Sequence, residues 1–217
     1  MNNGHLANRH DKCHKCSSRV AEVAFMHNEQ ISELLAYARS LGVSDAKLLD
    51  VARITVEDHF RDLCEDPRCP NYNTSINCPP HSMTPAQFRD LIKRFTHVIA
   101  FKFDMPMEAV QEATLREAAL LLHETTAAVE HQAKSLGFER ACGYSSGGCK
   151  RTFCYERADC AALQEGGQCR HPDKARPSLS GMGVNWQTLS KTLGWIMHKS
   201  ENAGRDTVMM AGLVFLE

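Results

Sequence analysis

His97-Val98-Ile99-Ala100-Phe101-Lys102-Phe103 carries apolar side chains at most of its positions, which predicts a buried β-strand. On its N-terminal side, Thr84 and Pro85 are typical of a helix start, because threonine caps a first turn and proline suits the first helical position. On its C-terminal side, we expect the longest helix over Met107–Ser135, ended by Gly137. These patterns indicate a sheet covered by helices.

The flanking segments continue this alternation of strands and helices. Residues 145–182 are the exception, because they contain five glycines and too little periodicity for long elements. The fold class that we expect is α/β, or α+β, with a small sheet of three to four strands, flanking helices and a cysteine-rich, loop-rich region. The remaining expected elements are helices over Glu29–Leu41 and Thr188–His198, a strand running into a short helix over Lys47–Val56, and strands over Phe138–Tyr144 and Thr207–Leu216.

The composition is that of an ordinary globular protein. The chain has 217 residues, 43% of them hydrophobic and 24% charged, with a net charge of -1. This balance excludes a disordered chain and a strongly basic nucleic-acid module, and no apolar run is long enough for a membrane span. We expect a flexible tail over residues 1–19 and a single metal-binding domain over residues 20–217. The N-terminus has neither the basic start nor the apolar run of a signal peptide, so we expect a cytoplasmic protein.

Ten cysteines are too many to be explained by packing. In a reducing compartment, such a number indicates metal ligands before it indicates disulfides. The cysteines are also clustered, because 63 residues without cysteine separate Cys78 from Cys142. The first group is Cys64, Cys69 and Cys78, within residues 64–78, and the second, within residues 149–169, is Cys149, Cys154, Cys160 and Cys169.

The spacing of these cysteines favours an iron–sulfur cluster over zinc. Structural zinc prefers ligand pairs two to four residues apart, and a gap of two residues occurs at Cys13-His-Lys-Cys16 alone. The looser gaps of four, five and eight residues suit a larger [4Fe–4S] cubane, whose irons lie apart. Prolines that directly follow Cys69 and Cys78 are also typical of ferredoxin-like cysteine runs. Zinc remains the alternative cofactor.

Four cysteines in one group can close a cluster, whereas three leave one metal position without a protein thiolate. That position could bind a substrate or an external ligand, or it could be closed by Cys142, by His81 or by a residue of the Cys13–Cys16 pair. Both groups could also share one site. On the long helix, His123, Glu124, Glu130 and His131 could form a carboxylate–histidine site, although we favour a solvated helix face.

The motifs Cys64–Phe95, with Cys-Pro-Asn-Tyr and Asn-Cys-Pro-Pro-His-Ser-Met-Thr-Pro-Ala-Gln-Phe, resemble a prokaryotic family of predicted metal-binding proteins of unknown function. The second half of the chain resembles the same family at Gly147-Gly148-Cys149, at Cys169-Arg-His-Pro-Asp-Lys-Ala-Arg-Pro-Ser178 and at Gly181-Met-Gly-Val184. The resemblance covers roughly Lys47–Val184. It implies cysteine-rich metal binding of the iron–sulfur type and no established reaction.

The resemblance carries over to individual residues. Cys142 and the pair Cys13 and Cys16 lie outside the pattern. The metal ligands that the resemblance implies are Cys64, Cys69, Cys78, Cys149, Cys154, Cys160 and Cys169.

Our leading hypothesis is a protein that carries one or two iron–sulfur clusters and acts in electron transfer or as a redox accessory protein with a redox partner. The alternatives are a zinc-stabilised interaction module without a redox role and an enzyme that uses an open iron of a three-cysteine cluster. We expect neither nucleic acid nor a membrane as a partner. The sequence assigns no substrate, no reaction and no catalytic residue.

Overall fold

A computed structural model describes residues 27–66, 69–107, 111–195 and 207–217. The expected tail over residues 1–19, with Cys13 and Cys16, lies outside these residues. A helix over residues 27–40 comes before the first strand. The elements that follow are β1 (Asp45–Asp50), a 3₁₀ helix (Val51–Arg53), α2 (His59–Asp62), α3 (Pro85–Ile92), β2 (His97–Pro106), α4 (Glu112–Ser135), β3 (Cys142–Ser145), α5 (Cys149–Phe153), 3₁₀ turns (Ala161–Leu163 and Ser180–Met182), α6 (Trp186–Leu193) and β4 (Thr207–Leu216).

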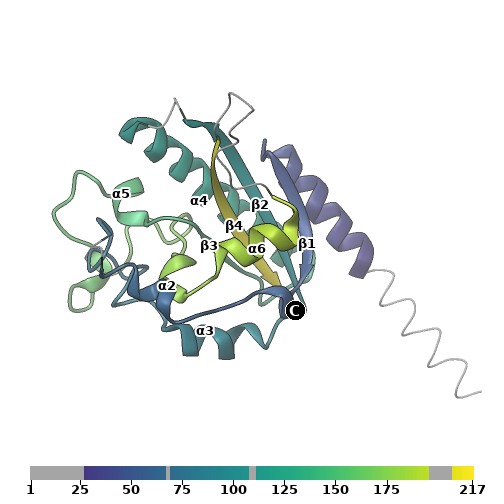
Figure 1. The fold of residues 1–217 in the computed structure, drawn as a ribbon, viewed down its shortest axis with the longest axis horizontal. Helices are drawn as coiled ribbons and strands as arrows, with labels where there is room; N and C mark the ends of the chain where they lie inside the picture. The colour runs from purple at the N-terminus through teal and green to yellow at the C-terminus, as the bar shows by residue number, and fades with distance from the viewer. Residues whose placement is uncertain (1–26, 67–68, 108–110, 196–206) are drawn as a thin grey trace, which may run out of the picture.

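The strands form one four-stranded sheet in the order β1-β2-β4-β3, and all neighbours are antiparallel (Figure 1). The longest ladder joins β2 to β4, from His97 opposite Leu216 to Pro106 opposite Thr207. Strands that alternate with helices but pair antiparallel define the α+β class, which settles the choice that the sequence left open.

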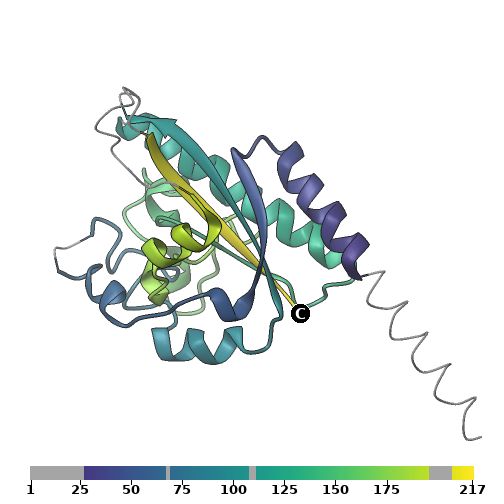
Figure 2. The same ribbon diagram turned by 45° about the vertical axis from the view of Figure 1, so that its right-hand side comes forward.

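Both faces of the sheet are buried, and this explains the continuous apolar run in β2. Side chains alternate between the faces of a strand. Val98 and Ala100 pack toward α3 and α6, whereas Ile99 and Phe101 pack toward α4 and the helix over residues 27–40. Figure 2 shows the helices on either side of the sheet.

Most expected elements are confirmed, and their limits follow local chemistry. Thr84 caps α3, because its hydroxyl oxygen accepts the backbone N–H of Gln87. The side-chain oxygen of Gln87 in turn accepts the backbone N–H of Thr84, which completes a capping box. The helix over Glu29–Leu41 and the strand over Thr207–Leu216 are also confirmed.

Three expected limits are wrong. α4 begins at Glu112 instead of Met107, because β2 continues through Pro106 along its partner β4. β3 does not include Phe138, which follows the left-handed Gly137 and packs into the core below α4. α6 begins at Trp186, because Asn185 caps it, and ends before the left-handed Gly194, while residues 196–198 of the expected helix are outside the described part.

The cysteine-rich loops lie together at the outer edge of β3. Ser145 forms a parallel bridge with Ser178, so the segment around Ser178 extends the sheet beyond its last strand. The backbone N–H of Ser178 then donates to the carbonyl of Asn77 at 3.1 Å. Segments about a hundred residues apart in sequence, one before α3 and one after β3, therefore meet at this edge.

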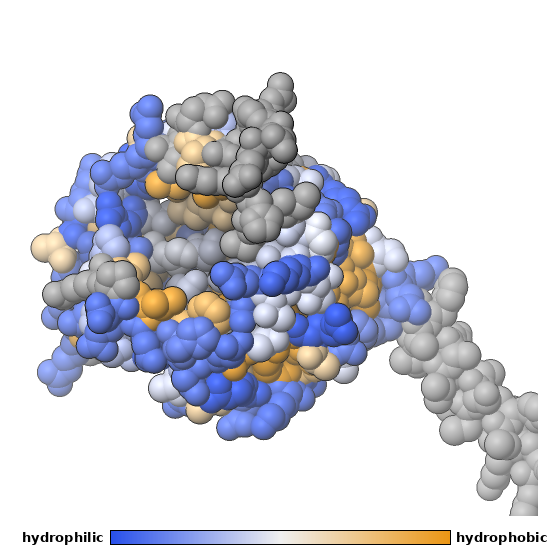
Figure 3. Space-filling model, viewed as in Figure 1, coloured by the Kyte–Doolittle hydropathy of each residue, from blue (hydrophilic) through white to orange (hydrophobic). Residues whose placement is uncertain are grey.

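The surface is mainly polar on the face seen in Figure 3, with small hydrophobic patches between hydrophilic residues. Exposed large apolar residues such as Leu63, Leu121 and Tyr155 come from different elements. Among the described helices, none has the length and apolar character needed to cross a membrane.

Truncation of Phe215 to alanine should destabilise the protein by about 3–5 kcal/mol, the usual cost of deleting a buried aromatic ring. Phe215 is fully buried, and its ring contacts those of Phe88, Phe95 and Tyr144 at centroid distances of 5.5–5.7 Å. Urea unfolding measures the change. Leu48→Ala, at a side chain 38% exposed, is the control and should cost much less; equal losses would contradict this view of the core.

Candidate metal centre

The first cysteine group is built on a compact loop that runs from the end of α2 to the start of α3. The backbone N–H of Cys69 donates to the carbonyl of Cys64, and that of Cys78 donates to the carbonyl of Ser75. Asn73 has the left-handed φ of 58° and donates its N–H to the carbonyl of Pro79 at 2.7 Å. These local bonds fold the loop back on itself and bring the three thiols together.

All three thiols of this group, Cys64, Cys69 and Cys78, line one cavity of about 120 Å³. We call it the three-cysteine cavity. Its remaining walls come from the loop itself and from the second cysteine region: Asn71, Tyr72, Pro79, Gly147, Gly148, Ser178 and Ser180.

Arg61 fixes the shape of the first loop. Its guanidinium donates to the carbonyls of Met83 and Gly181 at 2.8 Å each and to that of Pro80 at 3.0 Å. One side chain thus joins α2 to the loop before α3 and to the turn near Gly181. The same cation lies near Cys64 and opposes the rise in pKa that burial and the neighbouring Cys69 impose on that thiol.

The second group lines a separate cavity, which we call the four-cysteine cavity. Its volume is only about 20 Å³. Lys150 closes one side of the loop, because its ammonium donates to the carbonyls of Cys154 and Arg157 at 2.9 and 2.5 Å. The cysteines in its wall are Cys149, Cys154, Cys160 and Cys169, joined by Ser75, Ile76, Lys150, Phe153, Ala161, Arg170, His171 and Ala175.

The two cavities are neighbours, and Ser75 lies between them. Burial raises the pKa of Cys78 to about 12 and also raises the pKa of Cys149, and each thiol is within electrostatic reach of other cysteines. The Ser75 hydroxyl faces both sulfurs and lowers both pKa values. Ser75 is only 1% exposed, and within the described residues its oxygen has no hydrogen-bond partner besides these two sulfurs. A polar group buried in this way is suited to stabilise negative charge on sulfur.

Amide N–H groups also point at sulfur. The side chain of Asn77 donates to the Cys149 sulfur at 3.5 Å, and the backbone N–H of His171 lies 3.4 Å from the Cys169 sulfur. Soft thiol donors with N–H groups and cations around them fit a thiolate-bound metal. The described thiols line cavity walls without forming a ready-made site in which three or more side chains could hold one metal ion.

The suggested additional ligands lie elsewhere. Cys142, at the start of β3, lines a different cavity together with Glu130, Tyr144 and Arg176. The ring of His81 is exposed, and its Nε2 pairs with the Asn73 side chain at 2.8 Å. Neither residue lines the three-cysteine cavity.

The preference for a solvated face of α4 is wrong for His123 and Glu130, which are 0% and 8% exposed. The Glu130 carboxylate accepts from the guanidinium of Arg176 and from the backbone N–H of Gly143, both at 2.8 Å. The Nδ1 of His123 accepts the backbone N–H of Arg176 at 3.1 Å. These polar groups anchor the segment after Cys169 to α4 and thereby position the four-cysteine loop.

Sequence reasoning missed Arg61, Ser75 and Asn77 as residues that shape the metal centre. Ser75 and Asn77 stand in the polar stretch between Cys69 and Cys78, and this position was the available signal. No such signal marks Arg61 in the sequence, because its partners are mainly backbone carbonyls, one of them, that of Gly181, 120 residues away in sequence.

Comparison with known proteins also indicates metal binding, which suits cavities lined by cysteines. A family model described as "Predicted metal-binding protein (DUF2284)" matches residues 47–216, which include both cysteine groups. Neither a curated protein nor a solved structure matches the chain.

His123→Gln should reduce the sensitivity of the protein to acid. Burial, with a contribution from the nearby Arg176, lowers the pKa of His123 from 6.5 to about 4. Because the unfolded chain takes up this proton first, the stability that the neutral ring provides is complete above about pH 6.5 and is lost as the pH falls toward 4. Urea unfolding at pH 7 and pH 4.5 measures this loss, which the variant should reduce. An equal loss in both proteins would show that His123 does not titrate in this way.

Proposed function

The chain belongs to the family of predicted metal-binding proteins whose model it matches, and from this premise we propose that it carries two iron–sulfur clusters and acts in electron transfer. Cys149, Cys154, Cys160 and Cys169 would hold one cluster. Cys64, Cys69 and Cys78 would hold the other. The observation that carries the proposal is the division of these cysteines between two adjacent cavities, four thiols around one and three around the other.

The spacing of the cysteines along the chain supports a cluster over a single ion. Zinc draws its sulfur ligands to about 2.3 Å from one centre. The ligands of a [4Fe–4S] cluster bind separate irons, so they surround a volume instead of meeting at a point. The gaps of four, five and eight residues spread the thiols along their loops and therefore suit the separate irons of a cluster, although the four-cysteine cavity, at about 20 Å³, would have to widen to hold one.

The surrounding residues would support electron transfer through their charge and hydrogen bonds. Lys150 and Arg170 lie in the wall of the four-cysteine cavity and can offset the negative charge of thiolates. Asn77 and Ser75 direct polar hydrogens at sulfur, which stabilises the more negative, reduced state. A bound cluster would accept and release one electron at a time, and a partner protein would exchange it.

A second candidate function is an enzyme that uses the open metal position of the three-cysteine site. Within the described residues, the wall of this cavity has no fourth cysteine and no histidine. An unfilled position on a metal can bind and polarise a substrate. Asn71, Gly147 and Gly148 also border a second cavity of about 500 Å³, which gives such a substrate space.

Metal analysis of protein purified without oxygen tests the proposal. We expect about eight irons and a similar amount of sulfide per chain, with the visible absorption of an iron–sulfur protein that dithionite bleaches. Zinc without sulfide would overturn the proposal and leave the zinc-stabilised interaction module.

Alanine variants test whether the sites are separate. Cys160→Ala and Cys78→Ala should each remove about half of the iron, and Cys142→Ala, outside both cavities, should remove none. Complete loss of iron from either single variant would instead indicate one shared site.

Ser75→Ala should make the reduction potentials of both sites more negative, because it removes a buried hydroxyl that faces a sulfur in each group. Redox titration followed by electron paramagnetic resonance measures both potentials. Ser190→Ala is a matched control, since Ser190 is 3% exposed and its hydroxyl bonds to the carbonyl of Gln187 on α6. Unchanged potentials in the Ser75 variant would exclude this role.

A further inference from the structure

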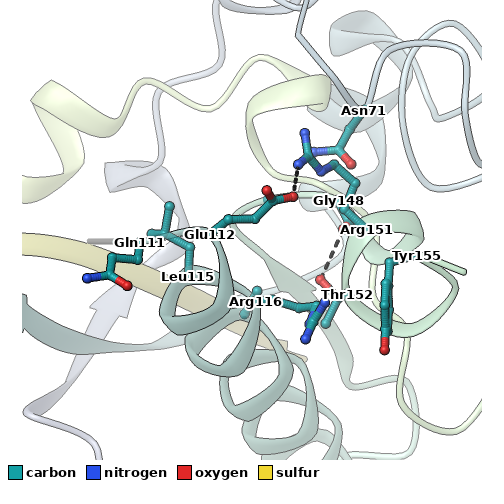
Figure 4. A pocket seen from close by; sticks show the side chains of 11 residues that line it. Asn71, Gln111, Glu112, Leu115, Arg116, Gly148, Arg151, Thr152 and Tyr155 are labelled. Atoms are coloured by element: carbon teal, nitrogen blue, oxygen red, sulfur yellow. Dashed lines mark hydrogen bonds and ion pairs between the residues drawn. The ribbon is translucent and has the colours of Figure 1, made fainter. Parts of the chain in front are cut away.

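We infer that the large cavity beside the three-cysteine site binds a small organic molecule through an oxyanion group, either a carboxylate or a phosphate. The inference deepens the proposed function and rests on it in one respect: the molecule would lie next to the metal position that lacks a fourth cysteine. We call this space the α4–α5 cavity, and its distinguishing residues are Glu112, Leu115 and Arg116 of α4 and Arg151, Thr152 and Tyr155 of the α5 region (Figure 4).

The α4–α5 cavity has the size of a small-molecule site. Its volume is about 500 Å³, within the range of roughly 300–1,000 Å³ that is usual for ligand pockets. Leu115 and Ala119 form an apolar part of its wall, and the ring of Tyr155 adds an aromatic edge. A ligand with a flat or apolar body of one ring fits these surroundings.

Two guanidinium groups give the cavity its preference for anions. Arg116 is held over the ring of Tyr155 at 4.0 Å, and no carboxylate of the described residues forms an ion pair with it. Stacking on an aromatic ring leaves the planar N–H groups of arginine free to bind an oxyanion by two parallel hydrogen bonds. Arg116 is thus a cation without a described acidic partner at the wall of a ligand-sized cavity.

Arg151 adds a second cation that an anion could recruit. It pairs with Glu112 at 2.5 Å, but the two side chains are 48% and 80% exposed, so water weakens this pair. The charged side chains that line the cavity are Glu112, Arg116 and Arg151, which gives a net charge of +1. Figure 4 shows both contacts, Glu112 with Arg151 and Arg116 beside Tyr155, between α4 and the α5 region.

The α4–α5 cavity borders the three-cysteine cavity across a thin wall. Asn71, Gly147 and Gly148 line both cavities, and two of them have no side chain. A Cβ at Gly148 would lie 2.5 Å from the Asn71 side chain, so glycine is required for this close approach. The Asn71 Oδ1 is buried and has no hydrogen-bond partner in the described residues. A donor on the ligand could satisfy this oxygen, which places the far end of the ligand beside the cysteines.

Isothermal titration calorimetry with three single-ring probes tests the inference: benzoate, phenyl phosphate and the neutral benzyl alcohol. The protein is the full chain, purified without oxygen. We expect at least one anion to bind and benzyl alcohol not to bind, and the tighter anion identifies the group as carboxylate or phosphate. Binding of neither anion, or equal binding of all three probes, would overturn the inference.

Arg116→Gln should weaken the tighter anion about tenfold or more, because it removes a charge-assisted pair of hydrogen bonds. Arg94→Gln, an exposed arginine that does not line the cavity, should leave binding unchanged. Arg116→Lys keeps the charge without the planar group and should bind with intermediate affinity. Equal weakening by Arg116→Gln and Arg94→Gln, or tight binding by Arg116→Gln, would contradict the assignment.

The same samples separate this inference from the proposed function. Calorimetry decides whether the cavity binds anions, and iron and sulfide content decides which metal the cysteines hold. If the cavity binds anions and the cysteines hold iron–sulfur clusters, the bound anion should also shift the electron paramagnetic resonance signal that Cys78→Ala abolishes. Anion binding to a zinc protein would support the cavity and reject the clusters.

Discussion

Three backbone hydrogen bonds at the open edge of β3 hold the cysteine region together. Ser145 donates to the carbonyl of Pro177, Leu179 donates to the carbonyl of Ser145, and Ser178 donates to the carbonyl of Asn77, all at 3.0–3.1 Å. An exposed edge strand has unpaired N–H and C=O groups that would otherwise attract another chain. Here that edge receives the segment after the four-cysteine loop, and this segment in turn receives the three-cysteine loop. The adjacency of the two cavities follows from this pairing.

Helix α4 connects the same edge to the rest of the molecule. A Cβ at Gly143 would lie 2.7 Å from the Thr126 side chain, and one at Gly212 would meet Thr126 at the same distance, so the glycines allow α4 to lie close against β3 and β4. The middle of α4 therefore supports the metal region through His123 and Glu130, while its first turns carry Arg116 into the α4–α5 cavity. One rigid helix thus relates the position of a bound anion to that of the cysteines.

The sequence was sufficient to predict where most helices and strands occur, because their signals are local, but not the antiparallel pairing of the strands or every limit. Apolar residues in β2, the cap at Thr84 and the glycine stop at Gly137 each act within a few residues. The division of the cysteines into groups of three and four could also be predicted, since each group lies within a short stretch. Arg61 and Ser75 could not, because what they contact depends on how distant loops meet. His123 and Glu130 were misjudged for a related reason: a helix pattern does not reveal that a loop ending in Arg176 will cover part of its polar face.

Buried polar atoms without partners show where this fold departs from ordinary packing. Each such atom costs about 1–3 kcal/mol, and folded proteins contain few of them. The described residues contain five such atoms, and two of them, Ser75 Oγ and Asn71 Oδ1, adjoin a cysteine cavity, whereas those of His123, Trp186 and Glu217 lie elsewhere. Metal binding deprotonates the thiols, and the hydroxyl of Ser75 can donate a hydrogen bond to a charged sulfur. Its burial would then be favourable instead of destabilising. The Asn71 oxygen accepts only, and thiolates cannot satisfy it. Asn71 lines both the three-cysteine cavity and the α4–α5 cavity, so a donor on a molecule bound in the α4–α5 cavity would satisfy this oxygen, beside a metal held among the cysteines.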